Sequence, residues 1–425
     1  MSDLLIRNAR LLDAATGRDE AGDLLIRDGM IAQSGADVSA PKGAKVIDAG
    51  GLCLSAGLID LRVKTGEPGA VQKETLSSAS AAAVAGGVTS MVVMPDTEPV
   101  IDDQALVEFV TRRGRDGLNR IYPAGALTRG LVGEAMAELG LMADAGAVFF
   151  SNGETSVANS AVMKRALAYA GELGVRVCVR AEDRALIGSG VMNAGALAAR
   201  MGLAGMGADA ELVAGLRDIV LARQTGCALI IDQVTTVALL EAVRAAKADG
   251  EKVGCTIAAH HLFFNELDVG DYLTYCKVSP PFRDEATRLA LIEGVRAGEI
   301  DAVVSAHDPQ PPEEKRVPFE DAAFGAAGLE TALAAMLALV ADGHMSLLEA
   351  LRPLTCGPAE LAGLAGGTLA DGALGDVILF DPDKPWLCQR EDLRSRSTNS
   401  PFDGRRMTGR VMATFVGGKQ VFARE

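Results

Sequence analysis

Residues 56–69 read AGLIDLRVKTGEPG, an apolar run that passes through two cations into a Gly- and Pro-containing loop. The run predicts a buried strand, and in a barrel enzyme the loop at such a strand end carries the chemistry. Arg62 and Lys64 are two positions apart, so on a strand their side chains project from the same face. Two cations on one buried face repel each other and are costly to remove from water. Two histidines at this spacing would share a metal ion, whereas an arginine and a lysine do not.

Around this stretch, apolar strand patterns alternate with Ala-rich helical patterns over residues 56–363. The alternation gives about eight strand–helix units over roughly 300 residues, the size of a (β/α)8 barrel. Residues 1–55 and 364–425 carry only short strand patterns separated by Gly and Asp turns. The sequence therefore predicts an α/β protein with a TIM barrel of the metal-dependent hydrolase type at 56–363. A small flanking β-sandwich is expected to be built from both ends, 1–55 plus 364–425.

The overall charge is acidic, with 56 acidic and 41 basic residues and a formal net charge of −15. This balance argues against nucleic acid or an anionic membrane as a partner. No apolar run reaches the roughly 20 residues of a membrane span. The seven cysteines form no CxxC pair, and the N-terminus does not resemble a signal peptide. We expect a cytoplasmic protein.

Histidine is scarce: only His260, His261, His307 and His344 are present, and none forms an HxH pair. A catalytic metal in a barrel needs neutral imidazoles and carboxylates that converge from several strand ends. His260 and His261 are adjacent, so on a strand they would face opposite ways. A histidine-rich binuclear centre therefore cannot be assembled from this composition.

Several long, ordered segments nevertheless resemble the dihydroorotase family of the amidohydrolase superfamily. They are AGLIDLRVKTGEPG, KETLSSASAAAVAGGVTSMVVMPDTEP, VRAEDRAL, AHHLFFNE, KVSPPFRDEATRLALIEGV, SAHDPQPPEEK, LGDVILFDPDKPW and SPFDG. The similarity extends over nearly the whole chain. It implies a metal-dependent (β/α)8 barrel with a flanking β-sandwich, with zinc as the cofactor of active relatives.

The resemblance also implies that the ligand and substrate positions of the family have changed. The ligand positions hold Arg62, Lys64, Ser151 (or its neighbour Asn152), Arg180, Gln233 and Ala306. The substrate positions hold Gly66, Asp96, Ser279 and His307. Because zinc ligands are neutral imidazoles, thiolates or carboxylates, we expect no catalytic residue of the family, no metal site and no cofactor.

Three positive charges would oppose a divalent ion at this place. At ~4–6 Å, each repulsion is worth about 3–4 kcal/mol even at an effective dielectric near 20. Arg62, Lys64 and Arg180 are expected to form internal ion pairs, and a remodelled anion-binding pocket is the alternative. Its candidate residues are Arg62, Lys64, Asp96, Arg180, His261, His307 and Asp308.

These departures predict a dihydroorotase-like protein of pyrimidine biosynthesis without hydrolase activity. Its expected partner is the catalytic chain of aspartate transcarbamoylase, in a homo- or hetero-oligomer. One alternative is an active amidohydrolase with a remodelled site, which hydrolyses a cyclic amide such as dihydroorotate to carbamoyl aspartate, with Asp308 as a candidate general base. A second alternative is a self-associating scaffold without enzyme activity.

Overall fold

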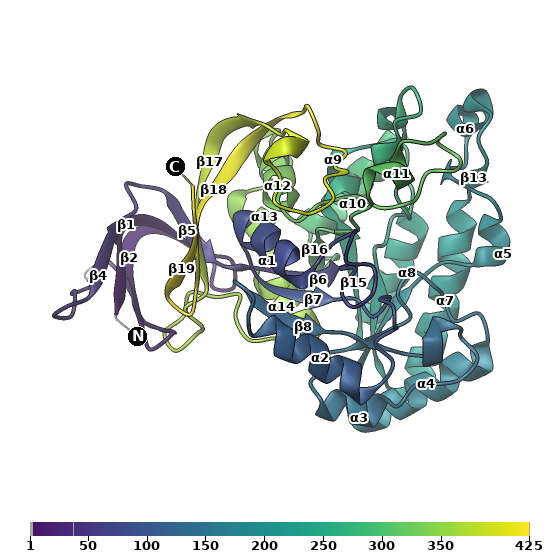
Figure 1. The fold of residues 1–425 in the computed structure, drawn as a ribbon, viewed down its shortest axis with the longest axis horizontal. Helices are drawn as coiled ribbons and strands as arrows, with labels where there is room; N and C mark the ends of the chain where they lie inside the picture. The colour runs from purple at the N-terminus through teal and green to yellow at the C-terminus, as the bar shows by residue number, and fades with distance from the viewer. Residues whose placement is uncertain (1–2, 37, 425) are drawn as a thin grey trace.

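The computed structural model describes residues 3–36 and 38–424. A β-domain at the left of Figure 1 contains both the purple N-terminal strands and the yellow C-terminal strands. A barrel surrounded by helices forms the rest of the molecule. No helix among the described residues is both long and apolar enough to cross a membrane.

The β-domain is one eight-stranded sheet within the described residues, with the order β19-β18-β17-β5-β1-β2-β3 and with β4 paired to β1. Its strands are β1 (Leu4–Asp13), β2 (Arg18–Arg27), β3 (Met30–Gly35), β4 (Lys45–Asp48), β5 (Cys53–Ala56), β17 (Val377–Leu387), β18 (Arg406–Val416) and β19 (Lys419–Ala423). Antiparallel pairing of β5 with β17, which places Ser55 opposite Ile378, joins the two ends of the chain. Ile6, Leu24 and Leu54 pack together in the apolar core of this sheet.

The barrel strands are parallel and lie side by side from β6 to β16. They are β6 (Leu58–Val63), β7 (Val88–Val93), β8 (Arg120–Pro123), β9 (Gly125–Ala126), β10 (Phe150–Ser151), β11 (Arg176–Arg180), β14 (Ala228–Asp232), β15 (Val253–Ala258) and β16 (Ala302–Val304). β8 and β9 are separated by Ala124 alone and follow one strand path. A parallel bridge between Val63 and His307 closes the barrel. The α/β barrel fold expected from the sequence is confirmed.

Helices cover the outside of the barrel (Figure 1). They are α1 (Leu76–Ala85), α2 (Gln104–Gly114), α3 (Leu139–Asp144), α4 (Ser160–Leu173), α5 (Arg184–Ile187), α6 (Ala196–Met201), α7 (Ala208–Thr225), α8 (Val237–Ala248), α9 (Ala259–Phe263), α10 (Glu285–Arg296), α11 (Pro312–Lys315), α12 (Ala332–Ala341), α13 (Leu347–Leu351) and α14 (Cys356–Ala362). The short strands β12 (Met192–Asn193) and β13 (Gly205–Met206) form a separate ribbon. Small buried residues such as Ala79, Ala82 and Ala83 let α1 pack closely, so few aromatic residues are needed in the core.

One local expectation differs from the structure. His260 and His261 lie in the short helix α9 rather than on a strand, so the rule that neighbours face opposite ways does not apply to them. Both rings contact Phe282, with centroid distances of 5.5 and 5.4 Å. The connection after β16 contains the helical turn α11.

A register shift in β6 decides where its polar residues point. The pairing of β6 with β7 is irregular between Asp60 and Val63, and such bulges commonly redirect a side chain next to a functional site. The Asp60 carboxylate accepts hydrogen bonds from the backbone N–H groups of Arg62 and Ser305, and thereby fixes the irregular segment. Arg62, which is 3% exposed, is consequently directed into the mouth of the barrel.

Candidate functional site

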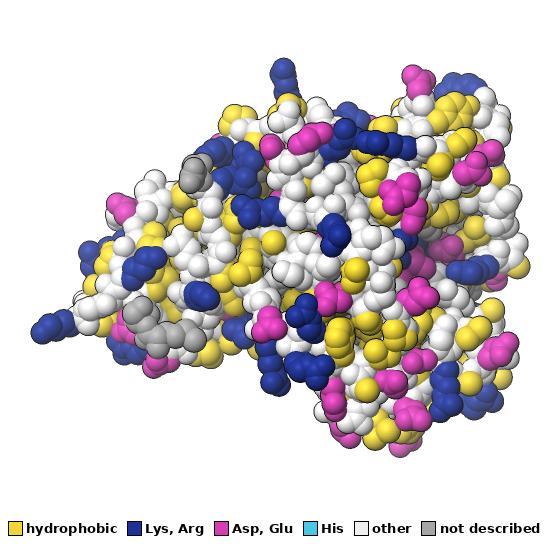
Figure 2. All heavy atoms as spheres, viewed as in Figure 1, with side chains coloured by type: hydrophobic (Ala, Val, Ile, Leu, Met, Phe, Trp, Pro, Cys, Tyr) yellow, Lys and Arg dark blue, Asp and Glu magenta, His cyan; other side chains and the backbone are white. Residues whose placement is uncertain are grey.

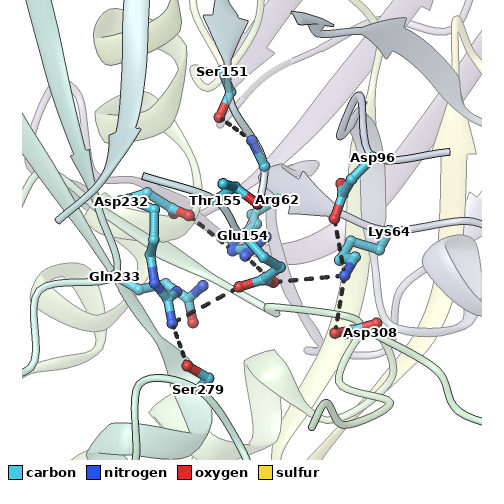
Figure 3. Close-up of polar contacts among 12 residues, drawn as sticks. Arg62, Lys64, Asp96, Ser151, Glu154, Thr155, Asp232, Gln233, Ser279 and Asp308 are labelled. Carbon is cyan, nitrogen blue, oxygen red and sulfur yellow. Dashed lines mark hydrogen bonds and ion pairs between the residues drawn. The ribbon is translucent and has the colours of Figure 1, made fainter. Parts of the chain in front are cut away.

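A cavity of about 360 Å³ lies at the carboxyl ends of the barrel strands. This is the end of a TIM barrel where active sites are found. Its lining includes Lys64, Glu154, Gln233, His260 and Asp308. Figure 3 shows that the polar side chains at this mouth come from several strand ends and point toward one another.

Arg62 is held by two carboxylates. Its Nη2 lies 2.5 Å from Glu154 Oε1, and its Nε lies 2.9 Å from Asp232 Oδ2. Asp232, at the end of β14, is also buried, so neither charge of this second pair is exposed to water. Burial would lower the pKa of Arg62, but its carboxylate neighbours outweigh burial and raise it above its ordinary value. Arg62 is therefore a permanent cation.

Lys64 lies among three carboxylates (Figure 3). Its Nζ is 2.9 Å from Asp96 Oδ2, 3.3 Å from Asp308 Oδ2 and 3.7 Å from Glu154 Oε1. Burial would lower the pKa of the ammonium group, and the three carboxylates raise it overall. Lys64 also lines a second cavity of about 370 Å³, whose lining includes Gly66 and Asp96.

Arg180, at the end of β11, has mixed partners. Its Nε lies 3.1 Å from Glu182 Oε2, its Nη2 donates to Ser279 Oγ at 3.0 Å, and Glu154 Oε2 lies 3.9 Å away. The Gln233 carboxamide also lies against this guanidinium. With its oxygen facing the two arginines, it accepts from Arg180 Nη1 at 2.8 Å.

Glu154 is the residue that sequence reasoning missed. It follows β10 and contacts all three cations at the mouth, Arg62, Lys64 and Arg180. Burial would raise the pKa of Glu154, but these three positive charges lower it to about 2. The one sequence signal for Glu154 was its position directly after FFSNG, the segment that holds the expected ligand position Ser151, and this signal did not specify its partners.

The pocket is not cationic, in contrast to the anion-binding alternative drawn from the sequence. Among the described residues, the ion-pair network contains three cations and five carboxylates, which leaves two net negative charges. The carboxylates are Asp96, Glu154, Glu182, Asp232 and Asp308. On the wider surface, Figure 2 shows acidic and basic side chains interspersed over the face in view.

The pKa of Asp308 is shifted in the opposite direction to that of Glu154. Burial raises the pKa of Asp308, Lys64 opposes that effect, and Glu154 and Asp96 add to it. Its Oδ1 accepts from Gln310 Nε2 at 2.8 Å, while Oδ2 faces Lys64. A carboxyl group with a raised pKa beside a cavity is suited to proton transfer.

The histidines are placed differently from the sequence expectation. His260, not His261, lines the cavity; it is 3% exposed, and its Nε2 has no hydrogen-bond partner. Burial and the neighbouring Arg62 lower the pKa of His260 to about 3, so its imidazole is neutral. His261 Nε2 is directed to the Pro280 carbonyl at 2.9 Å, and His307 Nε2 lies 3.2 Å from the buried Glu74. His261 and His307 therefore do not belong to the pocket proposed for them.

Other positions that the resemblance singled out differ in whether they line the cavity and in their backbone conformation. Ser279 lines the cavity, whereas Ser151 Oγ accepts from the backbone of Gly153. Gln233 and Ala306 have positive φ angles of 54° and 48°. This strained conformation costs on the order of 1–3 kcal/mol for a non-glycine residue and is concentrated at functional sites.

The residues present do not fit a zinc centre. No group of three or more His, Cys, Asp or Glu side chains in residues 3–36 and 38–424 is arranged to hold a metal ion. The carboxylates at the mouth already face Arg62, Lys64 or Arg180. The unpartnered imidazole of His260 would supply a single nitrogen ligand, whereas zinc sites in enzymes use three protein ligands.

Comparison with known proteins gives a consistent result. Residues 51–238 match the family described as DHOase, Dihydro-orotase-like. A dihydroorotase of Pelobacter propionicus is 41% identical over 423 residues, 99% of this chain and 100% of the relative. A dihydroorotase of Geobacter sp. (strain M21) is 40% identical over 421 residues and 99% of each chain. The structure of an L-hydantoinase (dihydropyrimidinase) from Arthrobacter aurescens superimposes with a TM-score of 0.90 at 27% identity, covering 99% of this chain and 96% of that one.

Proposed function

Because this chain belongs to the dihydroorotase family, we propose that it is a hydrolase that opens a cyclic amide at its C–N bond. Dihydroorotate is the first substrate to test, because relatives about 40% identical over their whole length are described as dihydroorotases. That end-to-end similarity is the observation that carries the proposal. The cavity at the carboxyl ends of the strands supports it, since family chemistry takes place at this end of the barrel.

The same finding corrects the function predicted from the sequence. We expected a chain without hydrolase activity that serves as a partner of aspartate transcarbamoylase. The expected lack of hydrolase activity is wrong, because relatives that match over their full length are described as dihydroorotases. The expected partnership with aspartate transcarbamoylase stays a prediction. Substitutions at the expected ligand positions affect one way of activating water and do not remove the whole site.

In the proposed reaction, water attacks the amide carbonyl carbon and the ring C–N bond breaks. Asp308 takes the proton from the attacking water, for which its raised pKa and its place in the cavity wall suit it. The same proton then passes to the leaving nitrogen as the C–N bond breaks, which gives a carboxylic acid and the N–H of the released amide or amine. The acid loses its remaining proton to solvent and becomes a carboxylate. Lys64, 3.3 Å from Asp308, supplies positive charge where the carbonyl oxygen becomes negative.

Two neutral groups are suited to orienting the ring. His260 belongs to the cavity wall, and its buried Nε2 has no hydrogen-bond partner in the protein, so the imidazole is a candidate to hydrogen-bond an amide group of the substrate. Ser279 Oγ, held by Arg180, lies in the same wall. Because both groups are neutral in this proposal, they bind the ring without altering the charge balance of the network.

The test is a hydrolysis assay on the purified chain, with product identified by mass spectrometry. We expect ring opening of dihydroorotate or, failing that, of an uncharged dihydropyrimidine or hydantoin. A variant at Asp308 made in parallel guards against activity from a contaminating hydrolase. Absence of turnover on all three ring types, with a folded protein, would overturn the proposed function.

A further inference from the structure

Lys64 occupies the position that a bound cation would occupy among carboxylates. Asp96, Asp308 and Glu154 come from three different strand ends, yet each places an oxygen within 3.7 Å of the single Lys64 Nζ. With Lys64 in place, no group of His, Cys, Asp or Glu side chains among the described residues is arranged to hold a metal ion. Oxygen atoms that converge from separate segments on one positive charge are nevertheless what a hard divalent cation requires of its ligands. Here the positive charge at that point is covalently tethered to β6.

Arg62 and Arg180 supply positive charge to the other carboxylates of the network. Arg62 neutralises the buried Asp232, and Arg180 neutralises Glu182. The oxygens of Glu154 are divided among all three cations. Every carboxylate of the network therefore has a side-chain counter-ion within the chain.

We infer that Arg62, Lys64 and Arg180 are built-in counter-ions that take the place of a divalent metal, and that Lys64 is the one that closes the site to metal. This goes beyond the proposed hydrolysis, because it concerns what holds the barrel mouth together and not which bond is broken. The disagreement between the family's zinc chemistry and the residues of this chain is the observation behind it.

The physical basis is competition for the same oxygens. A metal ion entering among Asp96, Asp308 and Glu154 has to displace the ammonium group of Lys64, which stays nearby because its side chain is anchored in the strand. A tethered competitor acts at a high effective concentration. The displaced charge would also remain next to the ion and repel it.

The wild-type chain tests the inference that the barrel mouth is stable without a divalent metal. Metal content is measured on protein purified from zinc-supplemented cells, and the melting temperature is measured with and without a chelator. We expect substoichiometric metal and a melting temperature that the chelator does not change. Stoichiometric zinc, or a melting temperature lowered by the chelator, would overturn the inference.

Lys64→Met tests the inference that Lys64 prevents metal binding, because it removes the ammonium group and leaves the three carboxylates facing one another. We expect this variant to gain stoichiometric binding of Mn²⁺ or Zn²⁺ by calorimetry and a melting temperature that rises with added metal. Lys73→Met is the matched control: Lys73 is also partly buried nearby, but it contacts only one carboxylate, Glu314 at 3.0 Å. This control is expected to gain no metal.

A folded Lys64→Met protein that binds no divalent ion would overturn the role assigned to Lys64. If the methionine variant does not fold, Lys64→Gln is measured in the same way, because it removes the charge and keeps a polar side chain. The readouts are metal stoichiometry and melting temperature. Failure of this inference is therefore distinguishable from failure of the proposed hydrolysis, which is measured by turnover.

Discussion

Arg62 Nη2 lies 2.5 Å from Glu154 Oε1, and this contact joins the end of β6 to the segment that follows β10. The two residues are 92 positions apart in the sequence. Because Glu154 also reaches Lys64 and Arg180, it connects the cations of two strands through one carboxylate.

Glu154→Gln is expected to destabilise the protein. The amide keeps the shape of the side chain but removes the charge that three cations share, and a partly unsatisfied buried ionic group costs about 1–3 kcal/mol. We use the lower half of that range, because the Glu154 side chain is 31% exposed and each cation retains another carboxylate. Chemical denaturation measures the loss.

Glu391→Gln is the control for this substitution. Glu391 pairs with Arg390 at 2.8 Å, and its side chain is 67% exposed. Exposed pairs contribute little, so no measurable change in the free energy of unfolding is expected. Equal effects of the two substitutions would contradict the central role of Glu154.

The contribution of Glu154 should depend on pH. Its pKa is lowered from the ordinary 4.5 to about 2: burial opposes ionisation, and the three cations outweigh burial. A lowered pKa in the folded state gives stability that is complete above pH 4.5 and is lost as the pH falls toward 2. The difference in unfolding free energy between wild type and Glu154→Gln should therefore decrease across this window. A difference that stays constant from neutral pH to pH 2 would show that the carboxylate charge is not the cause.

Asp308→Asn should abolish most of the proposed hydrolysis. A positioned general base contributes roughly 10²–10⁴-fold to rate, and asparagine cannot accept the proton from water. We expect the loss in kcat, with KM and the melting temperature changing little. Asp321→Asn, an exposed position on the same connection, is the control and should keep wild-type turnover. Full activity of Asp308→Asn would remove Asp308 from the reaction.

Gly66→Ala should destabilise the loop after β6. A Cβ at Gly66 would lie 1.8 Å from the carbonyl oxygen of Ala70, so the backbone has to move. Overpacking of this kind costs about 1–3 kcal/mol. Gly195→Ala is the control, since a Cβ there meets nothing within 4 Å. If both variants melt at the wild-type temperature, the loop is more adaptable than this packing indicates.

The sequence could predict the barrel because each of its strands and helices has a recognisable local sequence pattern. β6 is a buried, mostly apolar run with a Gly before it, and α1 begins after the capping residue Thr75 and ends before the C-cap Gly86. Only a few fold architectures are compatible with strands and helices that alternate in this way. The sequence could also predict that Arg62, Lys64 and Arg180 form internal ion pairs. Asp96, Glu182 and Asp232 are among their partners in the structure.

The orientation of the histidines could not be predicted in this way. His260 and His261 were placed on a strand, but β15 ends at Ala258 and a helical turn follows. His307 has a buried partner, Glu74, that lies 233 positions earlier in the chain. No local pattern encodes such a pairing, because it depends on how the strands close into a barrel.

The amino-acid sequence by itself determined the strand–helix alternation, the β character of both chain ends and the presence of Arg62 and Lys64 at the end of the first barrel strand, because periodicity and charge are local properties. Tertiary structure alone decided that Glu154 contacts all three cations, that five carboxylates outnumber them, and that His260 rather than His307 faces the cavity. The reason is that Coulomb energy and burial depend on distances between residues far apart in the chain, and only the closed barrel sets those distances.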